Sequence, residues 1–262
     1  MKEREKVLEI VQQLNIIDDT FFQKMAEDIG FCEEMISTIL GQKVTVKSVV
    51  PQNSIKNLQG RSVVLDALCM LENGEYCNVE LQKADDDNHA KRVRYNASCV
   101  TANITEPGIK FEKVPDVIGI YISKFDMFKS GKTVYHIDRV IRETGEVQNN
   151  GLQEVYVNTK IDDGSDIAEL MRIFKEKDTY NFKKFPKVSE RKKQFKENEG
   201  GSDKMCDLVE NYAKERVKQA EKENALKLFQ NGADYKLVRA SIASLSDDEL
   251  QKIYQEAKAA DL

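Results

Sequence analysis

Residues that build zinc or redox centres are scarce in this sequence. Its 262 residues include five cysteines and two histidines. The cysteines are odd in number and scattered, with no CxxC pair, and His89 and His136 share no ligand spacing with them. We therefore expect no zinc or redox centre, and this use of cysteine suits the reducing cytoplasm.

Long apolar runs and an excess of positive charge are also missing. The apolar runs, such as VPDVIGIYI at 114–122, are bounded by polar residues and fall short of the roughly 18 to 20 residues that span a bilayer. We expect no membrane crossing. The net charge of -5 excludes the global basic field of a protein that coats DNA, so any contact with nucleic acid needs a local patch and a local metal.

The length and composition of the sequence predict that the chain folds as two parts. With 262 residues and 40% hydrophobic content, the chain can bury one substantial α/β core and still carry a smaller element. After about Lys184, strand-forming residues become scarce and Lys, Glu and Ala dominate. We therefore expect a first domain over residues 1–184 and a helical C-terminal region over residues 185–262. The basic stretch KKFPKVSERKKQFK at 183–196 is either a contact with the DNA backbone or a solvated linker.

Helical and strand-like patterns alternate in the first part. Apolar residues recur at helical spacing up to Leu40, and Gly41 is placed to end that helix. A further helix is expected from about Asn88 to Ile104. Strand-like runs begin at Val44, Arg61, Val117, Thr133 and Leu152. The dipeptide Asn-Gly at 73–74 is a strong hairpin signal.

The C-terminal region contains signals for the ends of helices. Asn231-Gly232 marks the end of a helix that begins near Ser202, and Ser246 with Glu249 forms a capping-box pattern. The apolar positions of the long helix are interrupted by a polar middle around 216–223, so a continuous coiled-coil seam fails. Two alternatives remain for these helices: packing within the chain, or a compact homodimer contact.

Two carboxylates stand inside apolar strand-like runs. Asp66 lies in VVLDALCML and Glu80 in YCNVELQ. An unpaired buried charge costs on the order of several kcal/mol, and a bound cation would remove that cost. Carboxylate oxygens are the hard ligands that Mg²⁺ prefers, and a metal held in this way activates water for phosphodiester hydrolysis. The alternative is a pair of carboxylates at strand edges that reach solvent.

The hairpin turn decides whether these carboxylates meet. A two-residue Asn-Gly turn would pair Asp66 with Leu81 and send Glu80 to the opposite face of the sheet. A type I turn with a glycine bulge would form a three-residue loop at 72–74 and place Asp66 opposite Glu80. The sequence alone does not choose between the turns. A shared metal site requires the second, so we predict the longer loop, with Gly74 at positive φ.

The spacing Asp-(x)13-Glu-x-Gln from Asp66 to Gln82 resembles the PD-(D/E)xK nuclease superfamily. It is most similar to the Rpn branch of recombination-promoting nucleases and transposases, in which glutamine commonly stands where the general motif has lysine. Four other segments resemble the same branch: DTFFQKM from Asp19, Arg61 before its strand, KRVRYNAS from Lys91 and FEKVPDVIGIYI from Phe111. The resemblance covers roughly residues 8–160.

This resemblance implies a fold and a set of roles. The fold would be a restriction-endonuclease-like α/β core, with a central mixed β-sheet flanked by helices and an α-helical C-terminal extension. Asp66 and Glu80 would ligate Mg²⁺ or Mn²⁺, and Gln82 would orient water or the scissile phosphate. Arg92 and Tyr95 would bear on the DNA. Because glutamine carries no charge, a neighbouring cation or the metal must stabilise more of the developing negative charge.

Structural alternatives accompany these roles. Arg92 is equally consistent with an exposed helix arginine, and Tyr95 with a packing residue that has a polar tip. Glu33 and Glu34 are candidates for an extra acidic residue of the site, but solvated helix charges explain them better.

Two functions from different classes follow. The first is a metal-dependent DNA endonuclease linked to recombination or mobile elements. The second is a catalytically weak or inactive family member that acts as a DNA-binding or assembly protein. Either protein would be cytoplasmic and would not enter a membrane, and a homodimer through the C-terminal helices is compatible with both.

Overall fold

The computed structural model describes most of the chain. The described residues are 11–56, 61–85, 88–197, 209, 213, 217, 218, 220–242 and 245–259. Contacts divide the chain into two compact units, Met1–Met205 and Cys206–Leu262. The first unit contains a β-sheet with its helices, and the described residues of the second unit are helical or lie in turns.

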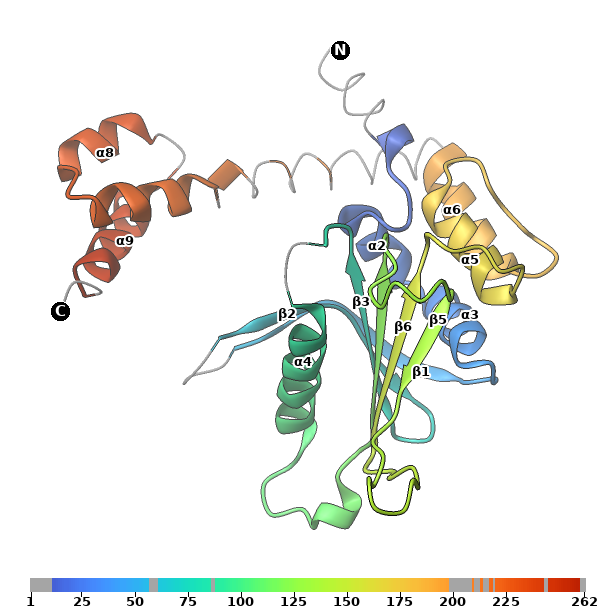
Figure 1. The fold of residues 1–262 in the computed structure, drawn as a ribbon. Helices are drawn as coiled ribbons and strands as arrows, with labels where there is room; N and C mark the ends of the chain where they lie inside the picture. Colours follow the sequence, from blue (N-terminus) through green and yellow to red (C-terminus); the bar gives the residue numbers. More distant parts are fainter. Residues whose placement is uncertain are drawn as a thin grey trace. The chain divides into compact units, whose positions relative to one another are not determined.

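A mixed sheet of six strands forms the centre of the first unit (Figure 1). The strands are β1 (Val46–Ile55), β2 (Val63–Leu71), β3 (Tyr76–Gln82), β4 (Val117–Ser123), β5 (Val134–Ile137) and β6 (Leu152–Asn158), and they lie in the order β1-β2-β3-β4-β6-β5. Neighbours β3, β4 and β6 run parallel, whereas the other pairs are antiparallel. The parallel strands therefore end together, with Gln82, Ser123 and Asn158 side by side.

The apolar patterns explain where the strands lie. Every residue of β4 is buried, as its nearly continuous apolar run predicts for a central strand covered on both faces. Strand β1 lies at an edge of the sheet and contains Pro51, which an edge strand tolerates because proline has no N–H for the ladder. The run from Thr133 gives only the short β5, and an isolated bridge between Val140 and Val147 follows it.

Helices lie on both sides of this sheet. In chain order they are α2 (Asp19–Ala26), α3 (Ile29–Leu40), α4 (His89–Ile104), the 3-10 turn η1 (Phe111–Lys113), α5 (Asp166–Lys175) and α6 (Pro186–Glu197). Helix α4 packs on β4, β2 and β1, and α3 packs on β1, α5 and α6. Figure 1 shows the strands between α4 and the group of α3, α5 and α6.

The predicted end of α3 and both predicted limits of α4 are confirmed. Gly41 follows α3 with a φ of 64°, the left-handed conformation that glycine adopts at little cost. Asn88 caps α4, and its side-chain oxygen accepts a hydrogen bond of 3.1 Å from the backbone N–H of Lys91. This cap satisfies one of the amide groups that a helix leaves unpaired at its start.

Two lysines of α6 are buried in the first unit. Lys192 and Lys196 are 0% and 5% exposed. The ammonium group of Lys192 donates to the backbone carbonyls of Ile173 (2.9 Å), Thr179 (3.1 Å) and Glu176. That of Lys196 donates to the carbonyls of Gln12 (2.9 Å), Val11 (3.3 Å) and Leu14. These carbonyls lie near the end of α5 and of the helical residues 11–13, where a helix leaves carbonyls without partners.

Helix α6 therefore changes two interpretations of the sequence. The break between the units was expected after Lys184, but the contacts divide the chain after Met205. The basic stretch at 183–196 is neither a solvated linker nor exposed along its length, because Lys192 and Lys196 are buried and Phe195 is 3% exposed. A count of basic residues could not separate lysines that face solvent from lysines that bind helix ends.

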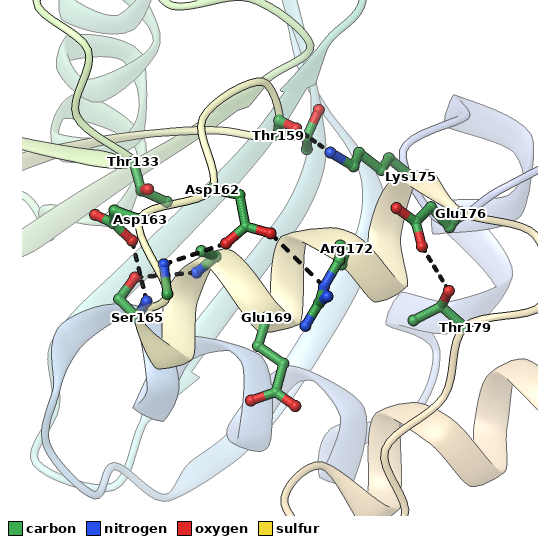
Figure 2. Close-up of polar contacts among 12 residues, drawn as sticks. Thr133, Thr159, Asp162, Asp163, Ser165, Glu169, Arg172, Lys175, Glu176 and Thr179 are labelled. Carbon is green, nitrogen blue, oxygen red and sulfur yellow. Dashed lines mark hydrogen bonds and ion pairs between the residues drawn. The ribbon is translucent and has the colours of Figure 1, made fainter.

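Side-chain contacts fix α5 beside the sheet (Figure 2). The hydroxyl oxygen of Ser165 caps the start of the helix. Arg172 lies 3.9 Å from the carboxylate of Asp162, and Lys175 donates a hydrogen bond of 3.1 Å to the carbonyl of Thr159, just after β6. The acidic residue Asp162, which precedes α5, thus pairs with a cation of that helix.

The second unit has its own small core. Residues 220–230, α8 (Tyr235–Ser241) and α9 (Asp247–Ala259) surround a buried cluster of Ala225, Phe229, Val238, Ile242, Leu245, Leu250, Ile253 and Ala257. Gly232 has a φ of 81°, and Ser246 and Glu249 exchange capping hydrogen bonds of 3.1 and 3.2 Å. Both predicted signals are thus confirmed. The helix start expected near Ser202 lies outside the described residues.

The predicted fold class is confirmed. The mixed six-stranded sheet between helices is the expected restriction-endonuclease-like α/β core. Within the part of the chain that the structure describes, no helix is both long and apolar enough to cross a membrane. The helical second unit follows this core in the chain.

Candidate nuclease site

The turn between β2 and β3 has the predicted three-residue loop. The backbone N–H of Leu71 donates to the carbonyl of Glu75 at 2.8 Å, and that of Gly74 donates to the carbonyl of Leu71 at 3.0 Å. Gly74 has a φ of 90°. The prediction of a glycine bulge, which the sequence could not decide by itself, is confirmed.

The loop sets the register of the hairpin. Met70 pairs with Tyr76, and the ladder continues to the pair of Ala67 with Val79. The paired residues end there, one step before Asp66 and Glu80, and the same register extended by one step would bring these two residues opposite each other. Both carboxylates line one cavity of about 530 Å³.

The cavity gathers charges of both signs. Its acidic lining residues are Asp19, Asp66 and Glu80, and its basic lining residues are Arg61, Lys91, Arg92 and Arg94. In a protein with a net charge of -5, this is a local concentration of cations around carboxylates. Such a mixture suits a phosphate-bearing substrate together with a cation.

Asp66 is held from two neighbouring strands. Its Oδ2 accepts a hydrogen bond of 2.8 Å from the backbone N–H of Leu81, and its Oδ1 accepts one of 3.4 Å from the amide of Gln52 in β1. Burial raises the pKa of Asp66 to about 6, and the charge of Asp19 adds to this rise. The hydrogen bond from Leu81 opposes it. Without a bound cation, the negative charge of Asp66 is therefore costly.

The pKa of Glu80 is raised more strongly than that of Asp66. Burial and the neighbouring charge of Asp66 raise the pKa of Glu80 to about 8. The amide of Asn78 donates to its Oε1 at 2.9 Å, and Asn96 of α4 gives a further hydrogen bond. Asn78 is 4% exposed, and its Oδ1 has no hydrogen-bond partner among the described residues. Two close carboxylates and an unpaired buried oxygen leave the site short of positive charge.

Gln82, the last residue of β3, and Arg92 of α4 form a hydrogen-bonded pair. The Nη1 of Arg92 donates to the Oε1 of Gln82 at 2.6 Å, and the Nε2 of Gln82 donates to the carbonyl of Ala84 at 2.8 Å. Arg92 also lowers the pKa values of Asp66 and Glu80. A cation from α4 thus stands beside the glutamine that replaces the lysine of the general motif.

Tyr95 lies at the edge of this group. Its hydroxyl donates a hydrogen bond of 2.5 Å to the carbonyl of Arg61, and its ring packs against the apolar cluster around Leu65 and Val100. It also lines the cavity. Tyr95 therefore connects α4 by a hydrogen bond to the segment that leads into β2.

Glu33 and Glu34 lie elsewhere and have structural partners. Glu33 accepts a hydrogen bond from the backbone N–H of Val46 at 3.2 Å, and Glu34 accepts one from that of Val188 at 2.8 Å. Neither residue lines the cavity. The acidic residue that the N-terminal helices contribute there is Asp19.

Four polar residues of the site could not be assigned from the sequence: Asp19, Gln52, Asn78 and Asn96. For Asp19 the only signal was its place at the head of the DTFFQKM segment. Asn78 shares strand parity with Glu80, so alternation could have placed it on the same face. Gln52 and Asn96 come from elements that only the tertiary fold brings to the hairpin.

The donor set fits a hard divalent cation. Asp66 and Glu80 supply carboxylate oxygens on adjacent strands, and burial, together with neighbouring negative charge, raises the pKa of both. Among the described residues, no group of three or more His, Cys, Asp or Glu side chains could hold a metal ion. Two protein carboxylates are nevertheless sufficient for Mg²⁺, which keeps several waters and completes its coordination with substrate phosphate.

Comparison with known proteins gives a match to a family model. The family model of the PD-(D/E)XK nuclease family transposase matches residues 27–236. No curated protein and no solved structure shows significant similarity to the chain. The match begins after Asp19 and continues beyond the resemblance at 8–160 into α8. Because it covers most of the sequence and the fold agrees with it, the chain belongs to the PD-(D/E)XK nuclease family transposases.

Proposed function

We propose that this protein is a DNA endonuclease that hydrolyses phosphodiester bonds with Mg²⁺ or Mn²⁺ held by Asp66 and Glu80. One observation carries the proposal: two carboxylates with raised pKa values line one cavity together with four basic side chains. A bound divalent cation would offset their mutual repulsion, polarise the scissile phosphate and lower the pKa of a bound water.

The remaining residues have separate tasks in this proposal. Arg92 supplies the positive charge that Gln82 lacks, because its guanidinium lies 2.6 Å from the oxygen of Gln82 and acts on both carboxylates. Gln82 orients the attacking water or the scissile phosphate through its amide. Arg61, Lys91 and Arg94 bind the phosphates on either side of the cut.

Tyr95 contributes to substrate binding indirectly. Its hydrogen bond to the carbonyl of Arg61 holds the approach to β2 against α4, and both elements line the cavity. Loss of this contact would let the walls that bear Arg61 and Arg92 move apart. Its proposed role is therefore to hold Arg61 and Arg92 in place on the two walls.

We further propose a setting for this activity. The substrate would be DNA of recombination events or mobile elements, in keeping with the family of the chain. Cys32, Cys69, Cys77 and Cys99 are free thiols, which suits a cytoplasmic protein. The second unit would mediate homodimer formation, since Leu228 and Leu237 are 40% and 63% exposed there.

Plasmid cleavage tests the proposal directly. Purified protein should nick or linearise supercoiled DNA in the presence of Mg²⁺ or Mn²⁺, and a chelator should stop the reaction. The matched control is the double variant Asp66→Asn with Glu80→Gln, which keeps the shape of both side chains but removes their charges. DNA binding without metal-dependent cleavage would favour the second function, a catalytically inactive member that binds DNA.

A further inference from the structure

One residue of β1 has a strained backbone close to the proposed metal ligands. Gln52 has a φ of 50°. Residues other than glycine rarely adopt this left-handed conformation, and they keep it only where the surrounding structure compensates for its cost. Among the described non-glycine residues, Lys129 is the other with positive φ, and it lies in an exposed turn. Gln52 instead lies in the middle of a strand.

The register of the sheet places Gln52 beside the site. Pro51 pairs with Ala67 and Asn53 pairs with Leu65, so Gln52 stands opposite Asp66. On its other side, Asp66 accepts a hydrogen bond from the backbone N–H of Leu81 in β3, and the neighbouring Glu80 lines the same cavity. Gln52, Asp66 and Glu80 thus come from three adjacent strands, β1, β2 and β3.

The side chain of Gln52 contacts Asp66 directly. Its Nε2 donates to the Oδ1 of Asp66 at 3.4 Å, while the Oδ2 of Asp66 accepts from the backbone N–H of Leu81 at 2.8 Å. Each carboxylate oxygen of Asp66 is therefore held by a different neighbouring strand. A hydrogen bond of this length adds little binding energy, so its main effect is on the orientation of the carboxylate.

We propose that Gln52 is a positioning residue of the nuclease site. Its left-handed backbone directs the amide at Asp66, and the two hydrogen bonds fix the plane of that carboxylate before a metal binds. Strain at this position is retained because an orientated ligand lowers the cost of assembling the site. The inference rests on the proposed role of Asp66 as a metal ligand.

Two substitutions separate the backbone from the side chain. Gln52→Gly removes the amide and also relieves the strain, because glycine adopts positive φ readily. Gln52→Asn keeps an amide and tolerates the left-handed conformation, although its shorter side chain reaches less far. The matched control is Asn53→Ala, on the next residue of the same strand, which pairs with Leu65.

Three measurements are made on each protein: the unfolding temperature without metal, the affinity for Mn²⁺ by calorimetry, and kcat and KM for DNA cleavage. For Gln52→Gly we expect a higher unfolding temperature, a Mn²⁺ affinity about 3- to 10-fold weaker and a kcat about 10-fold lower with unchanged KM. Gln52→Asn should recover part of the affinity and kcat. Asn53→Ala should match the wild type in affinity and kcat.

Other results overturn the proposal. Wild-type Mn²⁺ affinity and kcat in Gln52→Gly would show that the amide does not act on the site. A fall in unfolding temperature and affinity together, without recovery by Asn, would show a merely structural residue. If the wild type binds Mn²⁺ but does not cleave DNA, the nuclease function fails, while the Mn²⁺ affinities alone still decide the role of Gln52. A wild type that binds no Mn²⁺ overturns both.

Discussion

Two pairs of charged side chains in the first unit, one buried and one half-buried, have opposite surroundings. Lys192 and Lys196 of α6 each donate to three backbone carbonyls, which matches the three N–H donors of an ammonium group. Burial lowers the pKa of both lysines to about 8. At neutral pH they are therefore charged, and their hydrogen bonds connect helix ends across the core.

The carboxylates of the hairpin are less well satisfied. Asp66 accepts hydrogen bonds from Leu81 and Gln52, and Glu80 accepts them from two asparagine amides. Each ionised carboxylate has about four acceptor positions, and the two negative charges also repel each other. The comparison teaches that the lysines have complete hydrogen-bond partners and the carboxylates do not, and this difference is the reason to propose the hairpin as the place of a ligand.

Removing either carboxylate should have the largest effect. Asp66→Ala or Glu80→Ala should lower metal-dependent cleavage by about 10³-fold or more, because one remaining carboxylate both weakens and misplaces the cation. Both variants should stay folded by circular dichroism. Glu72→Ala, in the exposed hairpin loop, is the control. Near wild-type cleavage by either site variant would remove that residue from the mechanism.

The lysine pair should matter for stability instead of cleavage. Lys192→Met keeps the length of the side chain but removes the ammonium donor from three carbonyls, so unfolding in denaturant should require roughly 2 to 4 kcal/mol less free energy. Lys193→Met, whose lysine is half-exposed, should change stability by less than about 0.5 kcal/mol. Equal stability of Lys192→Met and wild type would contradict an architectural role for the pair.

Arg92 is a cation whose positive charge acts on the carboxylates of Asp66 and Glu80. Arg92→Ala should lower kcat by about 10- to 100-fold, since Gln82 cannot replace the missing charge. Arg92→Lys should retain part of the activity, although it loses the forked geometry. Steady-state cleavage of an oligonucleotide measures both. If Arg92→Ala raises KM alone, the guanidinium contributes to substrate binding and not to the transition state.

The carboxylates should also destabilise the protein when metal is absent. The pKa of Glu80 rises from 4.5 to about 8, so its protonated form favours the folded state. Its stabilising contribution is complete below about pH 4.5 and is lost as the pH rises through 8. In chelator at pH 9, Glu80→Gln should therefore be more stable than wild type, by roughly 1 to 3 kcal/mol. At pH 4 the two proteins should unfold at similar denaturant concentrations.

Added Mg²⁺ provides the control for this pH effect. The metal should raise the unfolding temperature of the wild type at pH 9, because it binds the folded state alone. The same addition should leave the double variant Asp66→Asn with Glu80→Gln nearly unchanged. A wild type whose stability in chelator is independent of pH would show that the hairpin carboxylates are not under strain.

Removal of the second unit should have the smallest effect on the first unit, which contains both pairs of charged side chains. A chain that ends at Met205 keeps α6. Its unfolding temperature should lie within about 2 °C of that of the first unit in the full-length protein. Its self-association, measured by sedimentation, should be lost if the second unit mediates dimer formation.

A chain that ends at Lys184 lacks both buried lysines and should not fold, in contrast to the boundary that composition suggested.

Local patterns in the sequence were sufficient for several elements. Gly41, Asn88, Gly232 and the Ser246 capping box mark helix ends because the chemistry of a helix end is local. The buried strand β4 followed from its apolar run. Asp66 and Glu80 were recognised as unusual because a charge within such a run conflicts with burial.

Other features depended on contacts between distant segments. The basic stretch at 183–196 gave no sign that Lys192 and Lys196 are buried, because their carbonyl partners lie up to 185 residues away. The position of Gln52 opposite Asp66 depended on the pairing of β1 with β2. The contact of Arg92 with Gln82 depended on the packing of α4 over the sheet.

The sequence by itself determined the family motif, the hairpin that carries it and the α/β class, because these depend on residue spacing and on the alternation of apolar side chains. Only the tertiary structure decided the turn, the amide and guanidinium partners of Asp66, Glu80 and Gln82, and the limit of the first unit. The physical reason is that hydrogen-bond partners and burial arise from the register between strands and the packing of helices. A single stretch of sequence does not fix either of these.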